Sequence, residues 1–250
     1  MPRPSKAAGS VALVTGANRG IGLAFVRELT ARGAKKVYAG VRDPDGLTDE
    51  FAGLPVEVVP LDVTDTESVA EQAQQNGGRV DIVVNTAEYI RAGGIVDRQG
   101  LTVARTEIDV RYLGLLRLAQ AFGPAMRARG GDGVNSATAF VKLLSVYALM
   151  NWPSYGAYAA VEAACLSATQ AMRAELRPGG VKVVNVFFGP LETEWFEAVP
   201  PPKVAPARLA SAVIDALRHG LEDVFVGEIA QDVRARLAVN PKALERELAG

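Results

Sequence analysis

Short apolar runs alternate along the chain with longer stretches in which apolar residues recur every three or four positions. Runs that are apolar without alternation predict strands buried on both faces of a parallel sheet, and the longer stretches predict helices. Strands separated by helices predict right-handed crossovers and a doubly wound parallel α/β sheet of the Rossmann type with helices on both faces. The expected strands are 11–14, 37–40, 56–59, 81–84, 137–144 and 181–187, and the main helices are one from about residue 20, 64–75, 99–129 and 153–176.

The rest of the chain continues this pattern without a linker before Pro200, so we expect one domain over residues 1–250. Prolines then mark a stiff break, followed by a predicted helix at 207–219 and a short strand at 224–226. Residues 232–248 form an amphipathic, charged segment that Pro241 interrupts. We expect this tail to serve assembly rather than chemistry.

The segment 10–25, SVALVTGANRGIGLAF, joins the first predicted strand to the first predicted helix. Gly16, Gly20 and Gly22 stand where the chain needs a positive φ or a backbone without a Cβ beside a ligand. The first N–H groups of the helix are unpaired and its dipole is positive there, so this turn favours a phosphate group.

The end of the second predicted strand indicates which dinucleotide fits. Arg42 lies 20 residues beyond Gly22, where an acid would bind a ribose 2′-hydroxyl and an arginine suits a 2′-phosphate. With Arg19 in the glycine turn, it favours NADP(H) over NAD(H), and the alternative is that both arginines are solvated. Asp62 is a candidate acceptor for an adenine amino group, or else a turn-forming aspartate.

Charge and cysteine content indicate which kinds of partner and which cellular setting the chain suits. The net charge is -1, with 27 basic and 28 acidic residues scattered along the chain, which argues against nucleic acid or a membrane surface as a partner. The single cysteine, Cys165, has small apolar neighbours, and it predicts a packed helix position and a reducing, cytoplasmic setting. No signal peptide, membrane span or metal-ligand spacing is expected.

Taken in order, these motifs resemble the short-chain dehydrogenase/reductase family over nearly the whole chain. The motifs are TGANRGIG at 15–22, LDVTD at 61–65, Asn85, Ser145 and, thirteen residues later, Tyr158. The resemblance implies a Rossmann-type sheet that binds NAD(P)H, and an Asn, Ser, Tyr, Lys tetrad that transfers hydride and proton between cofactor and a carbonyl or alcohol. It assigns Ser145 to orient the substrate oxygen and Tyr158 to act as acid or base. The implied cofactor-binding positions are Thr15, Gly16, Arg19, Gly20, Ile21, Gly22, Arg42, Asp62, Val63, Asn85 and Thr193.

Besides Phe188, which stands where the family usually has a proline, three positions at the expected active site depart from the family's pattern. The tetrad lysine, four residues after the tyrosine, is replaced by Glu162, and the helix asparagine is replaced by Arg111. The glycine of the family's Asn-Ala-Gly motif after the fourth strand is replaced by Glu88, a bulky acid where glycine allows close approach.

The lysine replacement reverses a charge beside the tyrosine. A charge about 5 Å from the tyrosine oxygen is worth roughly 3 kcal/mol at an effective dielectric of about 20. A lysine lowers the pKa of the tyrosine, whereas an ionised Glu162 raises it, so Tyr158 is expected to stay a neutral hydrogen-bond donor and a poor proton relay. Since Arg111 changes charge in the opposite sense, we hypothesise that it pairs with Glu162. The alternative is that the two are unrelated helix-surface residues in a chain that has lost activity.

We therefore expect an NADP(H)-binding enzyme that acts on a carbonyl or alcohol of a small, apolar substrate. Ser145 and Tyr158 are its expected catalytic residues, and Arg111 is expected to supply the positive charge of the missing lysine. One alternative is a non-redox cyclase, isomerase or lyase that uses Tyr158, Glu162 and Arg111 as acid, base and electrostatic clamp. Another is a non-catalytic nucleotide-binding protein. The resemblance also implies a homodimer or homotetramer that pairs through the helices at 99–129 and 153–176.

Overall fold

The computed structural model describes residues 6–45, 47, 51–97, 100–130, 138–197 and 199–248. Their strands form one seven-stranded parallel sheet in the order β3-β2-β1-β4-β5-β6-β7. The prediction of a doubly wound parallel sheet is confirmed. The strands are β1 Val11–Thr15, β2 Lys36–Val41, β3 Val56–Pro60, β4 Ile82–Asn85, β5 Ala139–Ser145, β6 Lys182–Phe188 and β7 Asp223–Val226.

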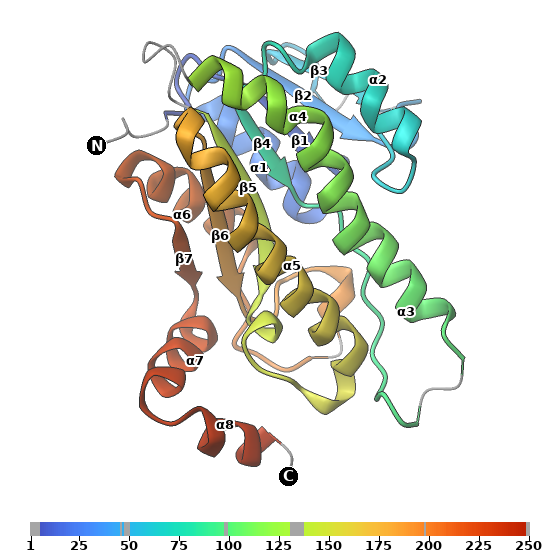
Figure 1. The fold of residues 1–250 in the computed structure, drawn as a ribbon, viewed down its shortest axis with the longest axis vertical. Helices are drawn as coiled ribbons and strands as arrows, with labels where there is room; N and C mark the ends of the chain where they lie inside the picture. Colours follow the sequence, from blue (N-terminus) through green and yellow to red (C-terminus); the bar gives the residue numbers. More distant parts are fainter. Residues whose placement is uncertain are drawn as a thin grey trace.

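Helices cover both faces of this sheet (Figure 1). In the view of Figure 1, α4 and α5 lie in front of the sheet and α1 lies behind it, where it packs against α6. The chain therefore winds outward in both directions from β1 and β4, and their carboxyl ends meet at the switch in strand order where such sheets bind ligands. The helices are α1 Gly20–Ala31, α2 Thr66–Asn76, α3 Thr102–Glu107, α4 Gly114–Gly130, α5 Gly156–Leu176, α6 Pro206–His219, α7 Glu228–Val239 and α8 Pro241–Leu248.

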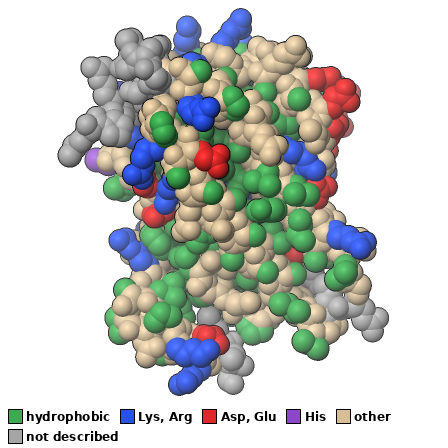
Figure 2. All heavy atoms as spheres, in the orientation of Figure 1, with side chains coloured by type: hydrophobic (Ala, Val, Ile, Leu, Met, Phe, Trp, Pro, Cys, Tyr) green, Lys and Arg blue, Asp and Glu red, His purple; other side chains and the backbone are tan. Residues whose placement is uncertain are grey.

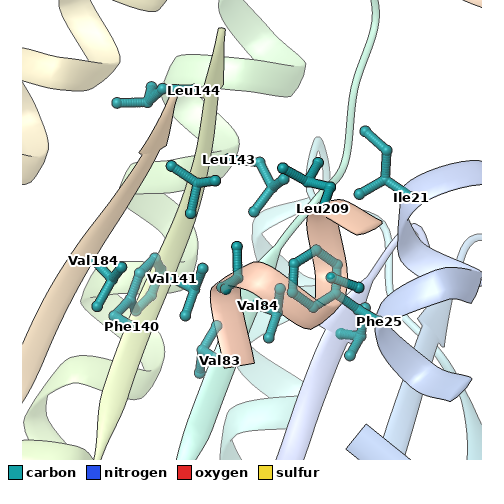
Figure 3. Packing of buried hydrophobic residues seen from close by; sticks show 14 of the residues in the cluster. Ile21, Phe25, Val83, Val84, Phe140, Val141, Leu143, Leu144, Val184 and Leu209 are labelled. Carbon is teal, nitrogen blue, oxygen red and sulfur yellow. The ribbon is translucent and has the colours of Figure 1, made fainter. Parts of the chain in front are cut away.

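Buried aliphatic and aromatic side chains join the helices to the sheet. Figure 3 shows Phe25 of α1 and Leu209 of α6 gathered beside Val84 of β4, and all three are fully buried. Burial of a side chain of this size contributes about 1.5–3 kcal/mol, so the apolar runs read from the sequence account for the rigid frame behind the site.

The long helix expected at 99–129 departs from regular geometry in its middle. After α3, the segment Ile108–Leu113 is a π-helix, and α4 continues from Gly114. A π-turn widens the helix by one residue and is frequent at functional sites. It carries Arg111, which is 1% exposed.

Other boundaries shift by two or three residues. The second long helix begins at Gly156 after a 3₁₀ turn at Pro153–Tyr155, not at residue 153. The helix predicted at 64–75 begins at Thr66, because the side chain of Asp65 caps it by accepting a hydrogen bond from the backbone N–H of Glu67. Residues 99 and 137, which the predicted helix and fifth strand included, lie outside the described residues.

Candidate active site

A cleft of about 820 Å³ lies at the carboxyl ends of β1, β2, β3 and β4. The glycine turn and the loop after β6 both line it, and the two touch where Arg19 pairs with Glu194. Of the predicted cofactor-binding residues, nine line this cleft, namely Gly16, Arg19, Gly20, Ile21, Gly22, Arg42, Asp62, Val63 and Thr193.

The glycines of the turn have the conformations that the sequence predicts. Gly16 has φ +60° and Gly20 has φ +52°, a region that side chains with a Cβ rarely adopt. A Cβ on Gly22 would lie 2.1 Å from the carbonyl oxygen of Gly16, so only glycine lets α1 pack against the turn. The residue before α1, Arg19, makes no side-chain capping hydrogen bond, and the start of the helix faces the cleft.

Thr15 and Asn85 are buried behind the cleft rather than on its wall. The Thr15 hydroxyl accepts hydrogen bonds from the backbone N–H groups of Thr86 (3.2 Å) and Ala87 (3.1 Å). The Thr86 hydroxyl in turn donates to the Thr15 carbonyl. Thr15 thus joins the end of β1 to the chain after β4 and fixes the backbone just before Glu88.

The charged residues of the cleft differ in how exposed they are and in which partners they bind. Arg42 is exposed at the end of β2 and lines the cleft. Arg19 forms an ion pair with Glu194 of the loop after β6 at 3.3 Å. Asp62 accepts hydrogen bonds through Oδ1 from the backbone N–H and the hydroxyl of Thr64, so it has the turn-forming role given above as its alternative.

The hypothesised ion pair between the two substituted tetrad positions is present and buried. Nε and Nη2 of Arg111 donate to Oε1 of Glu162 at 2.9 and 2.5 Å, and neither side chain is more than 1% exposed. Nη2 also donates to the carbonyl of Leu143 at 2.9 Å. The two residues are therefore not unrelated surface positions.

Ser145 is fully buried at the end of β5. Its backbone N–H donates to Oε2 of Glu162 at 2.6 Å. Both oxygens of Glu162 thus already accept hydrogen bonds, and a carboxylate so occupied is poorly placed to take a proton from a substrate.

Tyr158 is also fully buried, and neither it nor Ser145 lines the cleft. Its hydroxyl donates to Oε1 of Glu88 at 2.9 Å. Burial raises the pKa of the Tyr158 hydroxyl well above its ordinary value; Arg111 opposes the rise, and the carboxylates of Glu162 and Glu88 add to it. The predicted direction is therefore confirmed, but burial rather than Glu162 is its main cause.

Two charged residues near this site were not among the predicted site residues. Glu88 accepts the Tyr158 hydrogen bond, lies 3.6 Å from Nη1 of Arg111 and lines the cleft. Lys142 lies fully buried on β5, and no described residue offers its amino group a hydrogen bond. A single lysine inside an otherwise apolar strand was the sequence signal for the second of these residues.

Within the described ranges, no group of three or more histidine, cysteine, aspartate or glutamate residues is arranged to hold a metal ion. No helix among the described residues is both long enough and apolar enough to cross a bilayer. Cys165 is buried on α5, as its neighbours predicted.

The family model described as short chain dehydrogenase matches residues 10–203. An uncharacterized oxidoreductase of Staphylococcus aureus (strain N315) is 36% identical over 228 residues, which are 88% of this chain and 95% of that protein. Galactitol 2-dehydrogenase of Agrobacterium fabrum is 32% identical over 197 residues, covering 76% of this chain and 73% of its own.

Among solved structures, a short chain dehydrogenase from Burkholderia cenocepacia in complex with NADP is similar to this chain. The two share 37% identity with a TM-score of 0.91, over 98% of this chain and 99% of the other. A likeness of this extent includes the cleft as well as the sheet.

Proposed function

Because the chain belongs to the short-chain dehydrogenase family and is an oxidoreductase of that type, we propose that it binds NADP(H) and interconverts a carbonyl compound and an alcohol. The observation that carries the proposal is the convergence of the glycine turn, the start of α1 and Arg42 on one cleft. The similar Burkholderia protein holds NADP, which supports the same cofactor here.

The residues of the cleft fit this cofactor. The positive φ of Gly16 and Gly20 opens the backbone toward the cleft, and the start of α1 offers N–H groups to the diphosphate. Arg42 suits a 2′-phosphate. The buried hydroxyl of Thr193, which has no hydrogen-bond partner among the described residues, is available to the nicotinamide amide. When bound, the cofactor supplies or accepts a hydride.

The altered tetrad changes what the chain itself contributes. We propose that the backbone N–H of Ser145 helps to hold Glu162 and that Tyr158, buried behind Glu88 of the cleft wall, acts as a neutral hydrogen-bond donor. Its raised pKa and its bond to Glu88 support this role over that of a phenolate base. Arg111 and Glu162 act as positioning residues, because they hold each other and the end of β5. We expect a small, apolar carbonyl compound or alcohol as substrate.

The alternative is a non-redox activity, or cofactor binding without turnover. It is favoured by one observation, that none of the four tetrad positions lines the cleft. NADPH consumption with a panel of aliphatic and aromatic ketones and aldehydes distinguishes the redox function from this alternative. If the protein binds NADPH but consumes it with no member of the panel, the alternative is correct.

Replacing Arg42 with alanine is expected to weaken NADPH binding by about 10-fold or more and to leave NADH binding within about twofold, because one charged hydrogen bond is worth about 1.5–3 kcal/mol. Titration of cofactor fluorescence measures both. The matched control is Arg79→Ala, an exposed arginine just before β4, at the amino end of the sheet. Equal losses for both cofactors, or a wild-type preference for NADH, would contradict the assignment of Arg42.

We also propose a homodimer or homotetramer and a cytoplasmic setting. Hydrophobic side chains gather over the face that α4 and α5 form, as Figure 2 shows in the orientation of Figure 1. Leu113, at the start of this face, is 37% exposed, and Ala160 and Ala163 of α5 are exposed small residues that permit close helix approach. A second copy of the chain on this face would bury them.

A further inference from the structure

Glu88 stands between the cleft and the buried tetrad positions. It lines the cleft, while Ser145, Tyr158, Arg111 and Glu162 do not. Its side chain is 6% exposed, against 1% for Arg111 and none for Glu162. A group that moves a proton to or from a substrate must reach it directly or through one water. Among the described members of this cluster, Glu88 is the one that meets this condition.

The position of Glu88 is fixed from both sides. Its backbone follows Thr86 and Ala87, whose N–H groups are held by the Thr15 hydroxyl. Its Oε1 accepts the hydroxyl hydrogen of Tyr158 at 2.9 Å. A carboxyl group held by two elements in this way does not have to be ordered when a substrate arrives, which is what preorganised proton transfer requires.

The protein environment raises the pKa of the Glu88 carboxyl above the value that it has in water. Burial raises the pKa of the Glu88 carboxyl, Arg111 opposes the rise and Glu162 adds to it. The Tyr158 hydrogen bond and the more distant Lys142 also oppose it. The side chains that face Glu88 are thus Arg111 from the π-helix, Tyr158 and Glu162 from α5, and Lys142 from β5.

We propose that Glu88 is the catalytic acid and base of this enzyme and that Tyr158 is the residue that positions it. This inference rests on the proposed function. In the reduction, the O–H bond of the Glu88 carboxyl breaks and its proton passes to the carbonyl oxygen, while the carbonyl carbon takes up the hydride that NADPH supplies. The alcohol and a Glu88 carboxylate result, and the carboxylate regains one proton per turnover from the bulk solvent through the cleft. Oxidation of the alcohol runs the same steps backward.

The test compares three variants in the NADPH-dependent reduction of a ketone that the panel identifies. Glu88→Gln and Glu88→Gly are each expected to lower kcat/KM by about 100-fold or more, the usual loss when a general acid is removed. Tyr158→Phe keeps the carboxyl and is expected to lower it by about 10-fold or less. Glu71→Gln, an exposed acid on α2, is the matched control and is expected to leave it unchanged.

Two results in this comparison would overturn the inference. If Tyr158→Phe costs more than Glu88→Gln, the tyrosine is the acid. If Glu88→Gly raises turnover, Glu88 blocks the site instead of serving it.

A second readout needs neither cofactor nor turnover. In protein with ¹³C-labelled glutamate carboxyl groups, the NMR signal missing from Glu88→Gln belongs to Glu88. We expect it to titrate above the usual value of about 4.3, and to titrate at a different pH in Tyr158→Phe. A Glu88 signal that titrates at the usual value overturns the inference. A wild-type protein that consumes no NADPH contradicts the proposed function instead. The carboxyl titration still shows in that case whether the pKa of Glu88 is raised.

Discussion

Replacing Arg111 with methionine is expected to lower the free energy of unfolding by about 3–5 kcal/mol, the usual cost of breaking a buried ion pair from one side. The guanidinium is 1% exposed and is the partner of the fully buried Glu162. Without it, Glu162 stays buried with the N–H of Ser145 as its remaining partner among these contacts, and the carbonyl of Leu143 loses a donor. Denaturant unfolding of wild type and variant measures the difference.

The double variant Arg111→Met, Glu162→Gln tests the cause. A neutral glutamine still accepts from the Ser145 N–H and no longer needs a cation, so about half or more of the loss should return. Arg32→Ala is the control, because Arg32 pairs with Glu28 and Asp215 at a partly exposed site, where an ion pair contributes little to stability. A single variant that costs no more than Arg32→Ala would show that the buried pair contributes little.

Replacing Lys142 with methionine is expected to stabilise the protein at neutral pH by about 1–3 kcal/mol. Lys142 lies on β5 between Asn85 and Asn185 in the sheet register, and all three side chains are buried. Burial, with repulsion from Arg111, lowers the pKa of the Lys142 amine to about 8 from an ordinary 10.5. The folded state therefore pays to keep this amine charged at neutral pH, and methionine fills similar space without a charge.

The gain from this variant should depend on pH in a stated direction. Below about pH 8 both states hold the lysine proton and the full cost is present. Between about pH 8 and pH 10 the unfolded wild type binds more protons than the folded one, so wild-type stability rises relative to the variant and the gain shrinks.

Unfolding at several pH values measures this dependence. Lys36→Met, at an exposed pair with Glu57, should show no such trend. A Lys142→Met protein less stable than wild type at pH 7 would show that the amine has a partner worth more than its burial costs.

The sheet and the glycine turn could be predicted from the sequence because both depend on local patterns. Apolar runs without alternation give buried parallel strands, and Gly16 and Gly22 stand where the backbone requires them. The pair of Arg111 and Glu162 was also within reach, since two charges of opposite sign replaced two positions that the family places together.

The burial of Tyr158 and its bond to Glu88 could not be predicted in the same way. Spacing along the chain places Tyr158 on the correct face of α5. The partner of its hydroxyl is Glu88, which lies 70 positions away in the sequence and follows β4. The π-helix that carries Arg111 likewise could not be predicted from the spacing of apolar residues along the segment. Lys142 lies in a predicted strand, where the apolar pattern alone does not say what its charge does, although a buried lysine is rare enough to mark a special position.

The central claim is that this family member keeps Tyr158 protonated, because burial raises the pKa of its hydroxyl and the lysine that would lower that pKa is replaced by Glu162. The phenolate absorbance of wild type minus that of Tyr158→Phe, followed from about pH 6 to pH 10, tests the claim directly. We expect no phenolate from Tyr158 anywhere in that range. A Tyr158 phenolate half formed near neutral pH would contradict it.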